Sequence, residues 1–209
     1  MKEKLYQDGL KLINEFCRIN SIPIPEIIRL KKGDELYELA TCAYYRHPTI
    51  RIMVEKCASP GMGGRLWSWP GYVIDRTPYG VLQHELAHHM DTLRSQDILR
   101  NVNSPDLSFS ETIHKESLEK PMTGYTTQGH SRPQKIHWFM EWFAENFRVF
   151  VTNPDLCKRL RPKFYKAIVM RGIKPVIESN WLQTLEKQNA TQRIIEMAGK
   201  KIDDAQSLL

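Results

Sequence analysis

Apolar residues recur at helical spacing in the N-terminal part of the chain, from about residue 4 to residue 20. The apolar positions are Leu5, Leu12, Phe16 and Ile19. They fall on one stripe of a helix, as expected for an element that packs by one face. Two prolines within residues 21–25 then interrupt the pattern, because proline fixes φ and removes a backbone donor. We therefore expect an amphipathic helix that ends near residue 20.

Between Thr49 and Lys56 the apolar residues recur at every second position instead of at helical spacing. Ile50, Ile52 and Val54 alternate with other side chains there, and this alternation predicts a half-buried strand. Residues 46–48 fit a turn before it. The preceding stretch, residues 36–45, fits either a helix or a strand, because its first half favours a helix and its second half favours a strand.

Two further segments return to helical spacing. Thr77 and Pro78 have the residue types of an N-cap and a first turn, and the apolar positions after them predict a helix that runs to about Arg94. Residues 136–151 are almost entirely apolar or aromatic, so we expect a deeply buried helix there. Asn153 and Pro154 fit the start of another helix, and residues 181–198 fit a last one.

The expected helix over residues 136–151 carries Glu141 and Glu145 one turn apart on one face. Burying an ionised carboxylate without a partner is costly. A metal ion or a hydrogen-bonded imidazole is the kind of partner that removes this cost. The two glutamates are therefore candidate site residues.

Length and composition favour one globular domain over residues 1–209. We divide it into an N-terminal part (1–94) with the sheet, a polar loop region (95–135) and a helical part (136–209). A hydrophobic fraction of 41% and a charged fraction of 26% are ordinary for such a domain. No apolar run is long enough to span a bilayer, so we expect no membrane association and a cytoplasmic location. The four cysteines are scattered without a Cys-x-x-Cys pair, and we expect reduced thiols.

The chain has a net charge of +6, and much of the positive charge lies in one stretch between residues 158 and 174. A solvated helix face explains such a run more simply than a binding surface does. No nucleic-acid motif or aromatic platform accompanies it, so contact with nucleic acid is only weakly supported.

The sequence His84-Glu85-Leu86-Ala87-His88 places two histidines four positions apart within the helix expected after Pro78. Residues at that spacing differ by about 40° of rotation and about 6 Å of rise, so two imidazoles can converge on one cation. Glu85 lies about 100° round the helix, where its carboxylate can reach a water on the metal without binding the metal. Zinc suits this arrangement because it takes three protein ligands, keeps a position for water and lowers that water's pKa. The plain alternative is an amphipathic core helix with incidental histidines.

Three segments together resemble the gluzincin metallopeptidases, and among them the group around the catalytic domain of anthrax toxin lethal factor. They are His84 to His88, Thr123-Gly124-Tyr125, and the run Glu141-Trp142-Phe143-Ala144-Glu145-Asn146-Phe147-Arg148. The resemblance implies that His84, His88 and Glu141 hold one zinc ion and that Glu85 is the general base. It also implies that Glu145 hydrogen-bonds a ligand histidine and fixes its tautomer.

The remaining candidates follow from the same resemblance. Tyr125 matches a tyrosine that stabilises the oxyanion of a tetrahedral intermediate in that group. The segment between Tyr125 and Glu141 is longer than in that group, so His130 or His137 is the alternative for this role. Asp91 is a second possible partner of a ligand histidine, with a surface role as its alternative. His89 points elsewhere on the helix, and we do not expect it to bind the metal.

The expectation is therefore an α+β, zincin-like domain that acts as a zinc-dependent endopeptidase on protein or peptide substrates. Extended substrate would pair with an edge strand of the sheet. One alternative is a non-catalytic zincin-fold protein that uses zinc for stability or interaction. Another is a protease that acts on nucleic-acid-associated proteins. The sequence leaves the oligomeric state open.

Overall fold

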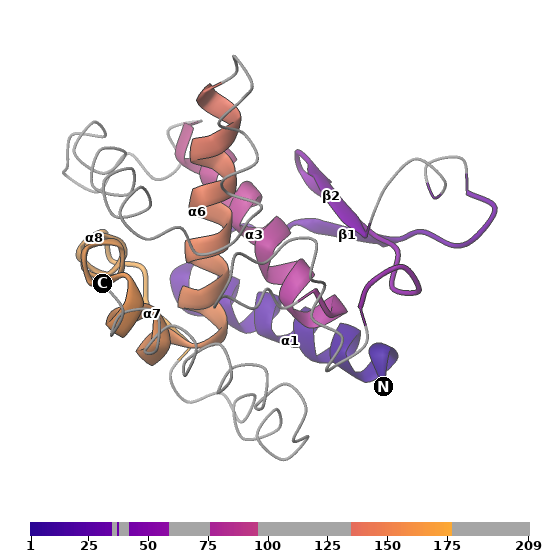
Figure 1. The fold of residues 1–209 in the computed structure, drawn as a ribbon, viewed down its shortest axis with the longest axis horizontal. Coiled ribbons are helices and arrows are strands. Elements are labelled where there is room, and N and C mark those ends of the chain that lie inside the picture. The colour runs from indigo at the N-terminus through magenta and orange to yellow at the C-terminus, as the bar shows by residue number, and fades with distance from the viewer. Residues whose placement is uncertain (35–36, 38–41, 59–75, 96–134, 177–209) are drawn as a thin grey trace, which may run out of the picture.

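The computed structural model describes residues 1–34, 37, 42–58, 76–95 and 135–176 of the 209-residue chain. A long helix, α1 (Lys2–Asn20), comes first and is followed by three short strands (Figure 1). The strands are β1 (Glu26–Arg29), β2 (Ala43–Arg46) and β3 (Thr49–Ile52). The helices that follow are α3 (Pro78–Ser95), α6 (Lys135–Thr152), α7 (Pro154–Leu160) and α8 (Pro162–Met170). This mixture of helices with a small sheet confirms the α+β class.

The sheet has the order β1-β3-β2, with β1 parallel and β2 antiparallel to β3. The strand expected after Thr49 is therefore confirmed as the central strand, although it ends at Ile52. Ile50 and Ile52 are fully buried in the main core, on the face that packs against the helices. Met53 is also fully buried, in a separate small cluster with Leu30 and Tyr37. The alternation in the sequence does not reveal this second cluster, because its other members come from outside the strand.

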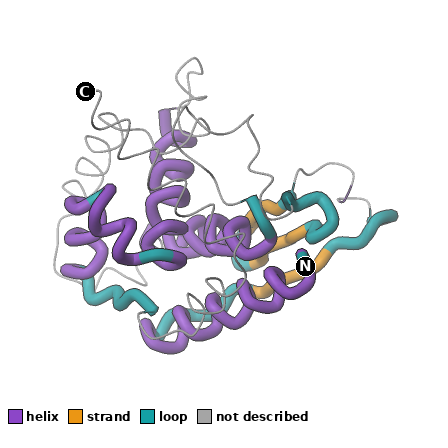
Figure 2. The backbone as a smooth tube through the Cα atoms, turned by 60° about the horizontal axis from the view of Figure 1, so that its bottom comes forward, coloured by secondary structure: helices purple, strands orange, loops and turns teal. Residues whose placement is uncertain are grey.

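The ambiguous stretch before the turn contains β2, so its second half is a strand. Within the described part of the chain β2 is an edge strand that pairs with β3, and both strands contact α3. Figure 2 shows the strands grouped at one end of the helical layer.

Helix α3 is the element on which the others assemble, since it packs against α1, α6, β2 and β3. The contact with α1 is close at Gly9, where a Cβ would lie 2.7 Å from Leu82 Cδ1 and 3.3 Å from Tyr79 Cα. The fully buried Gln83 donates from Nε2 to the Gly9 carbonyl at 3.1 Å. Helix α1 ends as expected, with Ser21 in the left-handed conformation at φ 53°.

Helix α6 has an aromatic face that fixes its position in the core. Phe143, Phe147 and Phe150 recur at helical spacing and are buried. Phe147 packs edge-on against Phe16 of α1, with ring centroids 5.5 Å apart, and Phe143 packs against Phe164 of α8 at 6.0 Å. The expected buried helix is thus confirmed. Among the described helices, none is long and apolar enough to cross a membrane.

The expectation of four reduced cysteines is wrong for one pair. Cys42 and Cys57 form a disulfide, with their Cα atoms 5.1 Å apart. Cys42 lies just before β2 and Cys57 lies after β3, so the antiparallel pairing of these strands brings the two cysteines together. Their wide spacing in the sequence gave no sign of this. Cys17 and Cys157 are free and buried.

Several expected elements lie outside the described residues. They are most of the polar loop region 95–135 and the last helix at 181–198.

Candidate metal centre

The local sequence sets the start and the orientation of α3. The Thr77 hydroxyl lies 3.5 Å from the Gly80 amide, and the Thr77 carbonyl accepts a hydrogen bond from the Val81 amide at 3.0 Å. The first contact serves a donor that the first helical turn leaves unpaired, and the second is the first i→i−4 hydrogen bond of the helix. Leu82 and Leu86 are fully buried in the core. Because they lie about half a turn from the histidines, His84 and His88 face the other way, towards α6.

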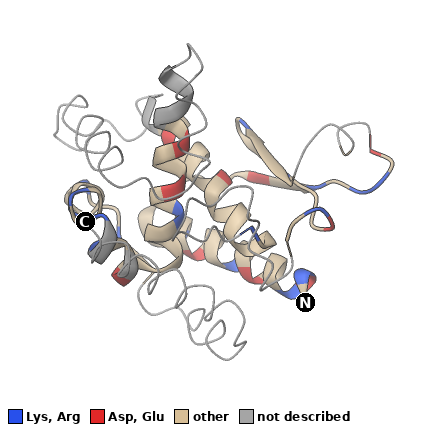
Figure 3. Cartoon of the chain, viewed as in Figure 1, with Lys and Arg blue, Asp and Glu red and all other residues tan. Residues whose placement is uncertain are grey.

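The two histidines and Glu141 converge where α3 crosses α6. The Nε2 atoms of His84 and His88 lie 3.2 Å apart. Glu141 reaches across from α6, with Oε2 3.1 Å from His84 Nε2 and Oε1 3.6 Å from His88 Nε2. Figure 3 shows acidic positions in red along the middle of α6, beside α3. The three residues expected to be ligands are therefore brought together, and they form a group that could hold a metal ion.

The ligand atoms lie close enough together to share one ion. Ligand atoms about 2.0–2.1 Å from a tetrahedral zinc ion are about 3.3 Å from one another. The separation of 3.2 Å between the two histidine nitrogens is close to this value, and one ligand atom from each of the three residues lies within 4.8 Å of the others. Two imidazole nitrogens and a carboxylate are also a donor set that zinc accepts at catalytic sites. The residues present therefore fit a zinc ion.

The second ring nitrogen of His84 is held by Glu145. His84 Nδ1 lies 2.7 Å from Glu145 Oε1, and the carboxylate requires a hydrogen on that nitrogen. The lone pair of a neutral His84 ring is then on Nε2, which faces His88 and Glu141. The expected role of Glu145 agrees with this geometry.

Electrostatics within this cluster favour the ionised carboxylates. Burial alone would raise the pKa of Glu141, but hydrogen bonds from His84 and His88 outweigh it and hold that pKa well below its ordinary value. Burial also opposes ionisation of Glu145, and the charge of Arg148 with the hydrogen bond from His84 lowers its pKa. Burial would lower the pKa of His84, yet its two carboxylate partners raise it to about 10. Without an ion, His84 is thus a buried imidazolium between two carboxylates.

Glu85 lies beside the ligand group on α3, facing β2. It is 6% exposed, and burial raises its pKa. The charges of His84 and His88 and a hydrogen bond from the Tyr45 backbone amide oppose this rise. A carboxylate with a raised pKa, one residue from a metal ligand, has the properties of a general base.

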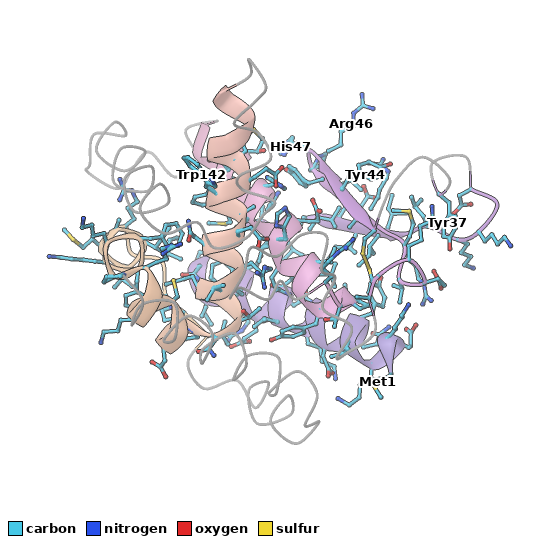
Figure 4. The ribbon with its side chains drawn as sticks, viewed as in Figure 1. Met1, Tyr37, Tyr44, Arg46, His47 and Trp142 are labelled. Carbon is cyan, nitrogen blue, oxygen red and sulfur yellow. A yellow bond between two sulfur atoms is a disulfide. The ribbon has the colours of Figure 1, made fainter. Side chains whose placement is uncertain are left out.

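His89 joins α3 to two other elements. Its Nε2 lies 2.9 Å from the Pro23 carbonyl, and its Nδ1 lies 3.0 Å from the Tyr45 hydroxyl on β2. A carbonyl only accepts, so Nε2 carries the hydrogen and Nδ1 of the neutral ring accepts from Tyr45. The Tyr45 hydroxyl is also 2.7 Å from Nδ1 of His47, which follows the last residue of β2. Figure 4 labels His47 next to the end of this strand. His89 is therefore turned away from the candidate ligand group, as expected, and joins the edge strand β2 to α3.

The other candidates divide into two kinds. Asp91 is half-buried on α3, and it does not hold His88, whose Nδ1 is buried without a hydrogen-bond partner among the described residues. Tyr125 and His130 lie outside the described residues. His137 belongs to the backbone of α6, but its side chain is likewise outside the description.

Arg148 and Tyr45 are the residues of the site that the sequence did not single out. Arg148 closes the resembling run on α6, so its place in that run was a usable signal. The role of Tyr45 depends on how β2 lies against α3, and nothing local in the sequence indicates that.

Comparison of the chain with protein-family models, with curated proteins and with solved structures finds no match. The class of site is thus defined by its own geometry: two histidines and a glutamate able to hold a metal ion, with a glutamate of raised pKa next to them.

Proposed function

We propose that this protein is a zinc-dependent endopeptidase of the gluzincin type. The observation that carries the proposal is the meeting of His84, His88 and Glu141, each with one ligand atom within 4.8 Å of the others. Glu85 stands outside this ligand set, and a site that uses zinc for stability alone has no need of such a base.

Each residue then has a defined part in peptide hydrolysis. Zinc, when bound to the three ligands, supplies a water of lowered pKa and polarises the scissile carbonyl. Glu85 accepts a proton from the attacking water and passes it to the leaving amine. Burial supports this part, because a raised pKa brings the carboxylate closer to the pH at which it must accept and release a proton.

The edge strand β2 is the proposed binding site for the substrate backbone. Among the described strands β2 pairs with β3 alone, and its Tyr45 amide hydrogen-bonds Glu85, which places the strand next to the proposed base. An extended peptide can pair with such an edge by main-chain hydrogen bonds, which would lay its backbone along the metal centre. Tyr125, His130 or His137 stays the proposed source of oxyanion stabilisation.

The location in the cell stays a prediction. A disulfide between Cys42 and Cys57 counts against the cytoplasm, where disulfides are rare.

The proposal is tested by measuring zinc content and peptide cleavage in matched variants. Glu85→Gln is expected to keep one zinc per chain and to lose cleavage of a mixed peptide library. Glu141→Ala is expected to lose zinc. Glu15→Gln, on the exposed face of α1, is the control and should change neither.

Two outcomes would contradict the proposal, and a third would change the class of substrate. Cleavage by the Glu85→Gln protein at the wild-type rate would remove the assigned base. Tight zinc binding by the wild type with no cleavage of any library peptide would favour a non-catalytic metal protein instead. Cleavage that requires DNA or RNA would point to substrates associated with nucleic acid.

A further inference from the structure

A row of three charged residues runs along the face of α6 that meets α3. Glu141, Glu145 and Arg148 are four and then three positions apart, so they lie within about 60° of one another around the helix. Glu141 and Glu145 belong to the metal centre already described. Arg148 belongs to the same row and contacts Glu145, but it is not one of the three candidate ligands.

The Arg148 side chain is buried, with 5% of its surface exposed, and contacts Glu145 through two nitrogens. Its Nε donates to Glu145 Oε1 at 3.3 Å, and its Nη2 donates to Oε2 at 3.1 Å. A guanidinium that contacts both oxygens of a carboxylate fixes its plane as well as its position. A single contact would leave the carboxylate able to rotate.

The same carboxylate oxygen serves both partners. Glu145 Oε1 accepts from Arg148 and lies 2.7 Å from His84 Nδ1. Any rotation of the Glu145 carboxylate would therefore move the acceptor that orients the His84 ring. The contacts thus form one chain from Arg148 through Glu145 to a metal ligand.

We propose that Arg148 is a positioning residue of the metal centre, which holds the Glu145 carboxylate in the plane that keeps His84 Nε2 aimed at the ion. The inference rests on the metal site of the proposed function and is independent of peptide hydrolysis.

The alternative is that Arg148 is an ion-pair partner within α6 and matters for stability alone. A matched control separates the two readings. Arg161 is also a buried arginine, 2% exposed, and its Nε donates to Asn146 Oδ1 at 3.1 Å. This contact holds the amide of Asn146 and not the carboxylate of Glu145, so its loss should affect stability and leave the candidate ligands in place.

The test is the zinc dissociation constant of Arg148→Met, Arg148→Lys and Arg161→Met, measured by competition with a chromophoric chelator. Urea unfolding of the zinc-free proteins is measured in parallel.

Arg148→Met is expected to weaken zinc binding about 10- to 100-fold, the range found when a partner of a metal ligand is removed. Arg148→Lys should fall between it and the wild type, because an ammonium cannot bridge both oxygens in a fixed plane. Arg161→Met should lose stability with its zinc affinity within about twofold of wild type.

A spectroscopic measurement covers the case in which Arg148→Met fails to fold. The visible spectrum of Co²⁺ bound in place of zinc reports the geometry of the ligands, and Arg148→Lys is expected to shift its bands while Arg161→Met leaves them unchanged. Unchanged zinc affinity and an unchanged Co²⁺ spectrum in the Arg148 variants would overturn the inference. A wild type that binds no zinc would remove both this inference and the proposed function. A wild type that binds zinc but cleaves nothing would remove only the proteolytic proposal.

Discussion

At the scale of single residues, His84 uses its two ring nitrogens for different purposes. Nδ1 faces Glu145, and Nε2 faces Glu141 and His88. Without an ion both nitrogens carry hydrogen, because the flanking carboxylates raise the pKa of this histidine to about 10. Only the hydrogen on Nε2 stands in the way of a metal, so His84 should release one proton when the ion binds.

We predict that zinc affinity rises about tenfold per pH unit between about pH 7 and pH 9. The pKa of His84 is raised, so its charged form persists throughout this window and competes with the ion until the pH approaches 10. The measurement is chelator competition at several pH values, corrected for protonation of the chelator. Titration calorimetry in buffers of different ionisation enthalpy should count about one proton released. A dissociation constant that does not change across the window would contradict the assignment.

The cysteines give a second prediction at this scale. Burial raises the pKa of Cys17 to about 12, and Cys157 is fully buried, so neither presents a reactive thiolate at neutral pH. The folded protein should react very slowly with iodoacetamide at pH 8. The denatured, unreduced protein should show two thiols and the reduced protein four. Four thiols before reduction would mean that Cys42 and Cys57 are not joined.

At the scale of elements, the crossing of α1 and α3 depends on a residue without a side chain. Gly9 would normally weaken a helix by about 1 kcal/mol relative to alanine. Its backbone carbonyl, however, receives the Gln83 side chain, and its Cα faces Leu82 and Tyr79 at close range. The close approach of the two helices therefore outweighs the helix propensity at this position.

We predict that Gly9→Val destabilises the protein by about 1–3 kcal/mol, the usual cost of adding atoms to a packed core. The added side chain must displace Leu82 or move the backbone at Tyr79, and it presses on the helix that carries the metal ligands. Urea unfolding measures the change. Gln7→Val is the control, since Gln7 is exposed on the same helix and tests the β-branched side chain without the clash. Equal stability of the two variants would argue against the close contact.

The sequence predicts the elements better than it predicts the contacts between them. The helical spacing after Thr77 and the apolar run around Glu141 reveal α3 and α6, because both patterns are local. The contact of Glu141 with His84 could be expected only because the run from Glu141 to Arg148 resembles the gluzincin metallopeptidases. The contact of Tyr45 with His89, and the disulfide before β2, depend on how distant segments pair, and no local pattern encodes that.

At the scale of the whole molecule, the metal centre joins two helices that are far apart in the sequence. Two ligands come from α3 and one from α6, while α3 also holds α1 and the sheet. The unfolded chain does not hold these three side chains together, so it has no formed site for the ion. Binding of an ion to the folded chain would therefore add directly to the stability of the fold.

We predict that removing the metal lowers the melting temperature of the entire described domain. At a free zinc concentration about 1,000 times the dissociation constant, binding adds about 4 kcal/mol. For a chain of this size that is a shift of about 10 °C. Thermal unfolding with zinc and with a chelator measures it, and Glu141→Ala should show almost no difference between the two conditions. A wild type that melts at one temperature in both would mean that the ligands do not act together.

The ionised groups around the crossing of α3 and α6 also limit the valence of the ion. Glu85, Glu141 and Glu145 each carry one negative charge when ionised, and Arg148 carries one positive charge, so these four side chains together carry two negative charges. A divalent ion with neutral imidazole ligands restores electroneutrality to this buried volume. Sodium would leave an uncompensated anion there and a lanthanide an uncompensated cation, each at a cost of several kcal/mol. Among the described side chains, this balance of charge favours a divalent ion over an alkali-metal ion or a trivalent ion where the two helices cross.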